Sequence, residues 1–364
     1  MSITTFSGSR TAKHSSSASR GRSTVLLGLW LLLSLSCLLV LGNGVVNISP
    51  GQALAILADS LGWHTAWPFS HEQQTVLLAI RAPRLVLGLL VGGSLAVSGA
   101  AMQGLFRNPL ADPALIGISS GAALAAVAVI VLQNTLFSGL AVLLGHYLLP
   151  VAAICGGFTV SWLVYRLADS GDRLDIGSLL LAGIAINALA GSATGLLVYI
   201  SNDDQLRTLT FWSMGSLSGV GWDSVLLGAP FLALNLIVLP LLAYPLNALL
   251  LGEAEAGHLG FPVERLKTAI VALVALGVGT AVALTGIIGF IGLVVPHLLR
   301  LLVGPDHRWL LPGSALLGAL LLLCSDYLAR TLAAPAEVPI GIITGVLGSP
   351  FFLWLLFRQK IMGH

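Results

Sequence analysis

The sequence predicts an all-α, polytopic membrane protein with ten transmembrane helices in each subunit. Of its 364 residues, 56% are apolar and only 9% are charged, and the mean hydropathy of +0.96 is well above that of soluble domains. Apolar runs of about 20 residues, long enough to cross a hydrocarbon core of about 30 Å, recur from end to end. No room is left for a separate soluble domain, and the alternating ten-residue strands of a β-barrel are missing.

The chain divides into a polar tail and one membrane domain. Residues 1–23 are rich in Ser, Thr and Arg, and we expect a disordered cytoplasmic N-terminal tail. Residues 24–360 are expected to form a single ten-span domain. A cleaved signal peptide is the alternative for the first apolar run, but that run is long and lacks a small-x-small cleavage site. The expected spans are 24–46, 85–106, 114–133, 146–166, 178–200, 226–250, 268–286, 288–303, 309–332 and 339–357.

The distribution of Lys and Arg predicts the orientation. With the N-terminus in the cytoplasm, thirteen of the 17 basic residues lie on the cytoplasmic side, as the positive-inside rule requires. The four on the outer side are Arg81, Arg84, Arg207 and Arg330. Ten spans place both termini in the cytoplasm, whereas an odd number would place the basic C-terminal end outside.

Two junctions between spans need comment. The second span is followed by the short polar loop Arg107-Asn-Pro-Leu-Ala-Asp-Pro113. A tight turn is the simpler interpretation of this loop, and contact with a cytoplasmic partner is the alternative. The seventh and eighth spans form one apolar run of about 36 residues, which is too long for one crossing and must be cut near 286–292.

A polar island at 252–267, between the sixth and seventh spans, predicts two short helices on the cytoplasmic surface. It holds five charged residues in a chain that is otherwise poor in them. Gly252 is expected to cap the first helix, with Glu253 near its positive N-terminal end. Gly260 is expected to end that helix in a left-handed conformation, and Pro262 suits the first turn of the next. A partner protein can grip a projecting helix pair of this kind.

Basic residues at the outer ends of two spans oppose the general charge trend. Arg81-Ala-Pro-Arg84 places two guanidinium groups at the mouth of the second span, and Arg330 lies near the outer end of the ninth. An outward Arg cluster can dock an acidic protein surface through bidentate contacts and steer its approach. Snorkelling to lipid headgroups is the alternative.

No catalytic centre and no metal site are expected. The chain contains neither His-Glu-x-x-His nor Gly-x-Ser-x-Gly. Its three cysteines are isolated in apolar runs, without metal or disulfide spacing. His297 is a lone histidine near a helix end, for which a structural role is simpler than ligation. Asp326 is the best candidate for proton coupling, but Arg330 follows four residues later and favours an ion pair.

The sequence also lacks an energy source of its own. It contains three lysines, none preceded by glycine, so there is no phosphate-binding loop of the Gly-x-x-x-x-Gly-Lys kind. Active transport without ion coupling would therefore need an ATPase on another chain. The island at 252–267 is the segment best suited to receive it.

Seven motifs between about 76 and 357, taken together, resemble the FecCD-like permeases of type II ABC importers. These importers take up iron–siderophore complexes, heme or vitamin B12. The matching motifs are Arg81-Ala-Pro-Arg84, Gly99-Ala-Ala-Met-Gln103, Arg107-Asn-Pro-Leu-Ala-Asp-Pro113, Leu251-Gly-Glu-Ala-Glu-Ala-Gly-His-Leu-Gly260, Gly289-Phe-Ile-Gly-Leu-Val-Val-Pro-His297, Asp326-Tyr-Leu-Ala-Arg330 and Glu337-Val-Pro-Ile-Gly341.

The resemblance implies a homodimer in the bacterial inner membrane, with the pathway on the two-fold axis. It also implies that a periplasmic substrate-binding protein docks on Arg81, Arg84 and Arg330, and it gives no reason to expect a nucleic-acid partner. Two cytoplasmic ATPase subunits, which use the ATP, would grip the residues Gly252, Glu253, Ala254, Glu255, Ala256, Gly257, His258, Leu259 and Gly260.

The resemblance further places Phe211, Trp212 and Met214 in a short helix beside the pathway. Gln103 and Asn187 are polar residues that we expect near the same cavity. The Gly-Glu-Ala-Glu-Ala form of the island is most similar to heme permeases, so heme (hemin) is the expected cargo and no permanently bound cofactor is expected. A ferric siderophore or vitamin B12 is the alternative, and an ion-coupled secondary transporter is the alternative of another class.

Overall fold

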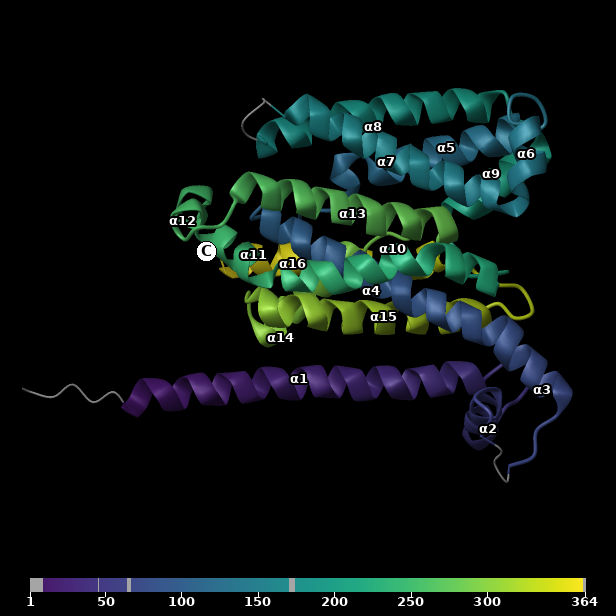
Figure 1. The fold of residues 1–364 in the computed structure, drawn as a ribbon, viewed down its shortest axis with the longest axis horizontal. Helices are drawn as coiled ribbons and strands as arrows, with labels where there is room; N and C mark the ends of the chain where they lie inside the picture. The colour runs from purple at the N-terminus through teal and green to yellow at the C-terminus, as the bar shows by residue number, and fades with distance from the viewer. Residues whose placement is uncertain (1–8, 45, 64–66, 170–173, 363–364) are drawn as a thin grey trace, which may run out of the picture.

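The computed structural model describes residues 9–44, 46–63, 67–169 and 174–362, and this part of the chain is a bundle of helices joined by turns (Figure 1). The helices that run along the bundle are α1 (Ser9–Gly42), α4 (Ala82–Leu105), α5 (Ile118–Leu132), α7 (Leu148–Ala168), α8 (Ile176–Tyr199), α10 (Trp222–Leu241), α13 (Val263–Thr285), α14 (Ile291–Val303), α15 (His307–Thr331) and α16 (Ile340–Met362). The shorter elements are α2 (Pro50–Ser60), α3 (His71–Thr75), η1 (Val76–Arg81), η2 (Pro113–Ile116), α6 (Ser138–Leu144), η3 (Gly145–Tyr147), α9 (Asp203–Ser213), α11 (Ala243–Leu251) and α12 (Glu253–His258).

The predicted number of spans is confirmed. Seven helical stretches in the described part of the chain are long and apolar enough to cross a membrane, and α5, α14 and the first part of α16 are shorter apolar helices. Together they make the ten spans. Short elements gather at the two ends of the bundle: α12 lies at one end, which we call the α12 end, and α9 at the other, the α9 end (Figure 1). The start of α1 and the end of α16 both lie at the α12 end.

Two elements differ from the prediction. Helix α1 begins at Ser9, so it overlaps most of the tail expected to be disordered, while residues 1–8 lie outside the described residues. The expected span 226–250 is divided at Leu242 into α10 and α11. Pro240 and Pro245 flank this break, and each lacks the backbone N–H that a continuous helix would use. The sequence pattern showed only one apolar run here, because proline does not interrupt hydrophobicity.

The expected cut in the long apolar run is confirmed. Helix α13 ends at Thr285, and Gly286 (φ 72°) and Phe290 (φ 69°) both have left-handed backbone before α14 begins. Gly286 has no space for a side chain, because a Cβ there would lie 2.0 Å from the carbonyl oxygen of Trp212. Helix α14 has 13 residues, about 20 Å of helix, so its irregular start lies within the thickness of the bundle.

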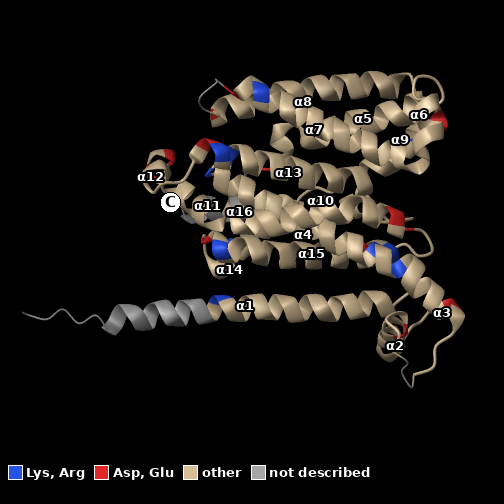
Figure 2. Ribbon diagram, in the orientation of Figure 1, with Lys and Arg blue, Asp and Glu red and all other residues tan. Residues whose placement is uncertain are grey.

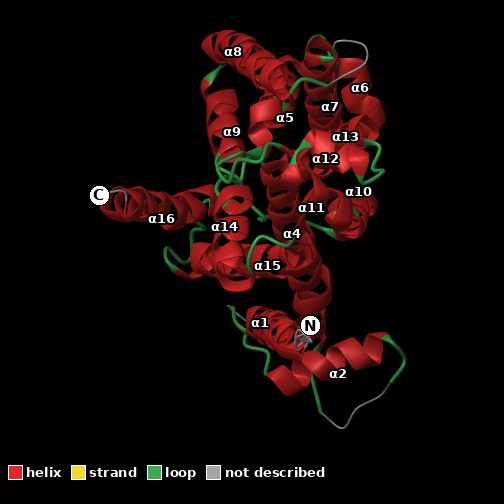
Figure 3. Ribbon diagram, turned by 90° about the vertical axis from the view of Figure 1, so that its left-hand side faces the viewer, coloured by secondary structure: helices red, strands yellow, loops and turns green. Residues whose placement is uncertain are grey.

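Helix α4 lies near the centre of the bundle when it is seen end-on (Figure 3), and its stretch is the most buried of the candidate spans. It packs closely on α15 where Gly92 faces Gly318: a Cβ on either glycine would lie about 2.5 Å from the carbonyl oxygen of the other. Small residues at such crossings let helices approach in lipid. The buried Asn235 of α10 adds a polar link, because its side chain bonds with Ser94 Oγ of α4 and donates to the Leu273 carbonyl of α13, both at 2.9 Å.

Candidate functional site

The α12 knob, residues 252–260, projects from the α12 end (Figure 1). Gly252 starts it with φ 129°, and Gly260 ends it with φ 87°, the left-handed conformation that the sequence predicts. The Phe261 N–H donates to the Ala256 carbonyl at 3.1 Å and closes the helix end. The second expected helix is not separate: Pro262 precedes α13, which continues for 23 residues.

The surface of the knob is open to a partner. Ala256 is buried underneath and anchors the helix. Gly252 is also buried and Glu253 is half-buried, whereas the other residues are exposed, and Leu259 has 61% of its surface exposed. An exposed leucine and an exposed carboxylate, that of Glu255, on one projecting helix are a combination that suits a protein contact. The exposed residues of the knob are Ala254, Glu255, Gly257, His258, Leu259 and Gly260.

A buried ion-pair cluster supports the base of the knob. Lys267 of α13 is 1% exposed, and its Nζ lies 2.7 Å from Glu253 Oε2 and 3.0 Å from Glu264 Oε1. The same Nζ donates to the Leu174 carbonyl at 3.0 Å, and the Leu174 N–H donates to Glu264 Oε2 at 2.8 Å. A buried ammonium requires such partners, because its desolvation is otherwise very costly. The cluster therefore joins α12, α13 and the segment before α8.

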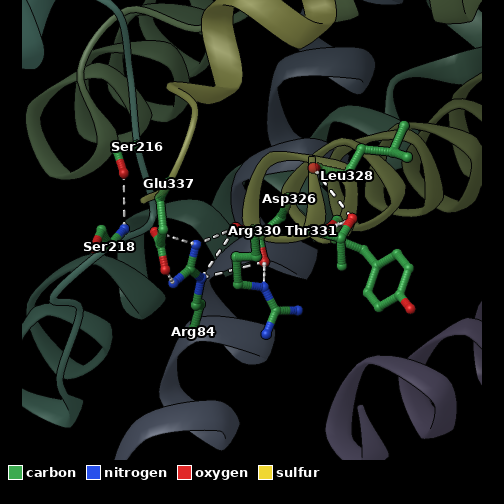
Figure 4. Close-up of polar contacts among 9 residues, drawn as sticks. Arg84, Ser216, Ser218, Asp326, Leu328, Arg330, Thr331 and Glu337 are labelled. Atoms are coloured by element: carbon green, nitrogen blue, oxygen red, sulfur yellow. Dashed lines mark hydrogen bonds and ion pairs between the residues drawn. The ribbon is translucent and has the colours of Figure 1, made fainter. Parts of the chain in front are cut away.

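Charged side chains gather near the two ends of the bundle (Figure 2). At the α9 end, Arg84 binds two carboxylates from distant parts of the chain (Figure 4). Its Nη2 donates to Asp326 Oδ1 at 2.8 Å, and its Nη1 donates to Glu337 Oε1 at 2.9 Å. Burial raises the pKa of Glu337, but the hydrogen bonds and charge of Arg84 outweigh burial, so that pKa lies below its ordinary value. Arg84 thus holds the turn between α15 and α16.

Arg330 lies in the same charged cluster as Arg84, Asp326 and Glu337 (Figure 4). Its Nε lies 3.3 Å from Asp326 Oδ2, which confirms the expected i,i+4 ion pair. Even so, Nε and Nη2 of Arg330 make no hydrogen bond within the described part of the chain. Asp326 therefore faces two guanidinium groups, and it is not the isolated acid that a proton relay within a span would use.

Arg81 is placed differently from the expectation that it faces outward. It is 7% exposed, and its guanidinium donates to three backbone carbonyls: Leu41 at 2.6 Å, Gly42 at 3.1 Å and Val46 at 2.5 Å. These carbonyls lie at and beyond the C-terminal end of α1, where a cation satisfies acceptors that the helix leaves open. In this structure Arg81 links α1 to the helix that contains α4.

The residues expected along the pathway fall into separate groups. Phe211 is exposed on α9, Trp212 is partly buried, and the carbonyl of Met214 accepts the N–H of Gly341 at 2.9 Å. Asn187 of α8 bonds to Ser120 Oγ and donates to the Ala114 carbonyl at 3.2 Å. The structure therefore brings α9 to the start of α16, and α8 to α5.

Gln103 lies apart from both groups, near the α12 end. It is buried, and its Oε1 accepts from Nη2 of Arg300 at 2.8 Å. A lining role for all five expected pathway residues remains a prediction.

Sequence reasoning missed the partners of Arg84 and Lys267. Asp326 lies 242 positions from Arg84, and Leu174 lies 93 positions from Lys267, so spacing along the chain could not pair them. The available signal was the cost of an unpaired charge in an apolar run, which predicts that a partner exists without identifying it.

Comparison with known proteins identifies the family. The model of the FecCD transport family matches residues 31–358. The hemin transport system permease protein HmuU of Yersinia pestis is 48% identical over 338 residues, covering 92% of this chain and 96% of that protein. The vitamin B12 import system permease protein BtuC of Salmonella arizonae is 40% identical over 334 residues, covering 92% and 94%.

A solved structure agrees with the sequence matches. A metal-chelate type ABC transporter in an inward-facing conformation superposes with a TM-score of 0.79 at 33% identity, over 92% of this chain and 99% of that one. The family match covers nearly all of the described bundle, including the α12 knob and the Arg84 cluster. The chain therefore belongs to the FecCD transport family and is a permease of an ABC importer of that family.

Proposed function

We propose that this permease works as a homodimer that imports heme, driven by two ATPase subunits bound at the α12 end. The observation that carries the proposal is the exposed α12 knob on its buried base, where Lys267 joins Glu253 to Glu264. A surface that receives mechanical force must be exposed where it is gripped and firmly connected beneath. The knob has both properties.

Charge supports the orientation. Among the described residues, Arg107, Arg166, Arg265 and Arg300 lie on turns or helix ends at the α12 end, together with Lys267. The positive-inside rule assigns this end to the cytoplasm. The α9 end then faces the periplasm of the bacterial inner membrane, and both termini are cytoplasmic.

A continuous set of contacts leads from the knob to the other end of the molecule. The Lys267 cluster connects α12 to α13, and the far end of α13 is bonded to the turn after α9, because the Ser216 N–H donates to the Thr285 carbonyl at 2.7 Å. That turn continues to α16, because the Ile340 N–H donates to the Gly215 carbonyl at 2.9 Å. A displacement of the knob can therefore reach α9 and α16 as a rigid-body movement.

The exposed apolar faces support a dimer with a central pathway. Leu181 and Leu196 of α8 and Val346 of α16 are largely exposed, and α16 stands out from the rest of the bundle in the end-on view (Figure 3). A second copy would cover these faces and enclose a space between the two subunits. Phe211, Trp212, Met214 and Asn187 are the residues that we place beside that space.

The cargo is proposed from similarity and requires its own experiment. The 48% identical relative is a hemin permease, and the 40% identical relative is a vitamin B12 permease. Vitamin B12 is therefore the second candidate. Heme passes through as substrate, and ATP is bound by the partner subunits.

The test reconstitutes the permease with its ATPase and its binding protein in proteoliposomes. We expect hemin uptake that requires ATP and both partners, and little competition by vitamin B12. Uptake of vitamin B12 in preference to hemin would reassign the cargo. Hemin uptake driven by a proton gradient without ATP would overturn the ABC mechanism in favour of a secondary transporter.

A further inference from the structure

A cavity of about 300 Å³ opens at the α12 end, between the end of α4, the end of α11 and the turn from α14 to α15. The polar residues that line it are Gln103, Arg107, Asn108, Arg300 and His307. Two of these are arginines, and none of the described residues in the lining is acidic. The volume is at the lower limit of small-molecule pockets, so the cavity suits a small anion with water.

Two buried polar atoms of lining residues make no hydrogen bond to the described part of the chain. Arg300 donates from Nη2 to Gln103 Oε1 at 2.8 Å, but its Nη1 is buried without a hydrogen bond to the described residues. His307 is 1% exposed, and its Nε2 is also unpartnered there. Buried polar groups are nearly always satisfied in folded proteins, because leaving one unpaired costs free energy. Both atoms therefore have hydrogen-bonding capacity left for a ligand.

The hydrogen bonds of Asn247 define the tautomer of His307. The Nδ2 of Asn247 donates to Asp306 Oδ1 at 2.7 Å, and its Oδ1 accepts the backbone N–H of His307 at 2.9 Å, which fixes the orientation of the amide. The same Oδ1 lies 2.9 Å from His307 Nδ1, so Nδ1 must donate. In the neutral ring Nε2 is then an acceptor. A ligand that satisfies this site presents anionic oxygens to Arg300 and a hydroxyl proton to His307.

Gly104 lies directly against Nε2 of His307. A Cβ at this position of α4 would lie 2.5 Å from His307 Nε2, which is closer than a van der Waals contact allows. Arg107 lines the same cavity from the exposed loop after α4. The donors of Arg107 and Arg300 and the acceptor of His307 therefore come from three different elements, and a bound anion would link the end of α4 to α14 and α15.

We propose that this cavity binds inorganic phosphate. Its P–O⁻ oxygens would accept from Nη1 of Arg300 and from Arg107, as guanidinium–phosphate pairs commonly do, and its P–OH would donate to Nε2 of His307. A lipid phosphodiester offers the same anionic oxygens but has no hydroxyl. Sulfate at neutral pH is similar in size and likewise lacks the proton. Phosphate binding in this cavity would require neither the cargo nor the ATPase.

The test is equilibrium dialysis of the full-length permease in detergent against radiolabelled inorganic phosphate. We expect saturable binding of one phosphate per chain, weak competition by sulfate, and at least a tenfold loss of affinity in Arg300→Gln. Gly104→Ala, which keeps every charge, should lose affinity to a similar degree. Arg166→Gln is the matched control, because Arg166 lies over the ring of Trp162 on α7, outside the cavity, and it should bind as the parent does.

Three outcomes would overturn the proposal. One is the absence of saturable binding in the parent. Another is an equal loss of phosphate affinity in Arg166→Gln, which would mean that phosphate binds through the overall positive charge of the protein and not in this cavity. The third is a phospholipid that native mass spectrometry finds on the parent but not on Arg300→Gln, while phosphate does not bind; this result would assign the cavity to a lipid headgroup.

Discussion

Lys267 Nζ lies 2.7 Å from Glu253 Oε2, and this ion pair connects the α12 knob to the long helix α13. The lysine is buried, whereas both of its carboxylate partners are partly exposed. A partner protein that moves Glu253 would therefore displace a group anchored inside the bundle. We propose that this ion pair transmits movement of the α12 knob to α13.

Lys267→Met should uncouple ATP hydrolysis from transport. The substitution keeps the apolar stem but removes the charge that holds Glu253, Glu264 and the Leu174 carbonyl together. We expect the ATPase to bind and hydrolyse ATP while uptake per ATP falls roughly tenfold, a loss of about 1.4 kcal/mol of coupling. Parallel assays of uptake and phosphate release measure this ratio. Arg265→Met, at the exposed neighbouring position, is the control, and an equal fall there would contradict the assignment.

Arg84→Met should lower the stability of the α9 end. It leaves the side chain of Asp326, which is 2% exposed, with Arg330 as its remaining cationic partner. Breaking a buried ion pair from one side costs about 3–5 kcal/mol, so we expect a clear fall in the thermal midpoint in detergent. The double variant Arg84→Met with Asp326→Asn should recover part of it, because it removes the uncompensated charge. A double variant no more stable than the single one would argue against the pairing.

Charge reversal should separate docking from structural roles among the outer arginines. Two guanidinium nitrogens of Arg330 make no hydrogen bond to the described residues. We therefore expect Arg330→Glu to weaken the affinity for the binding protein at least tenfold at low salt and less at high salt, because salt screens charge–charge interactions. Arg207→Glu on the exposed face of α9 serves as the control. Affinity measured by surface plasmon resonance that is unchanged in Arg330→Glu at low salt would exclude this residue from docking.

Asp306 should make the α14–α15 turn sensitive to acid. Hydrogen bonds from Arg308 and Asn247 lower its pKa from 3.8 to about 2, against the opposing effect of burial. A carboxyl whose pKa is depressed in the folded state stabilises it above the unfolded pKa, near 4, and this contribution is lost as pH falls through about 2. The thermal midpoint of the parent should therefore fall more than that of Asp306→Asn between pH 4 and pH 2. Parallel curves would contradict the linkage.

The sequence predicted the spans because each span is a continuous run of apolar residues. The ten expected runs match the helices closely, and the cut at 286–292 appears at Gly286 and Phe290. The break between α10 and α11 was not visible, because Pro240 and Pro245 interrupt hydrogen bonding and not the apolar run.

Contacts between segments that are distant along the chain could not be predicted from the sequence. The backbone of the α12 knob followed from its glycines, but its connection to Leu174 did not. Arg81 was expected at the surface with Arg84, because both share one motif. The structure separates them: Arg81 faces the end of α1, and Arg84 faces α15. Which side chain is buried depends on what packs against it, and that information lies tens to hundreds of residues away.

The most direct test of the account replaces the α12 knob, residues 252–260, with a Gly-Ser linker of the same length. The purified variant is then assayed for co-purification of the ATPase and for ATP-driven hemin uptake. We predict that the ATPase is lost while the permease remains folded by circular dichroism, and that uptake falls to background. An ATPase that still co-purifies and still drives uptake would contradict the central claim that this knob is where the motor acts.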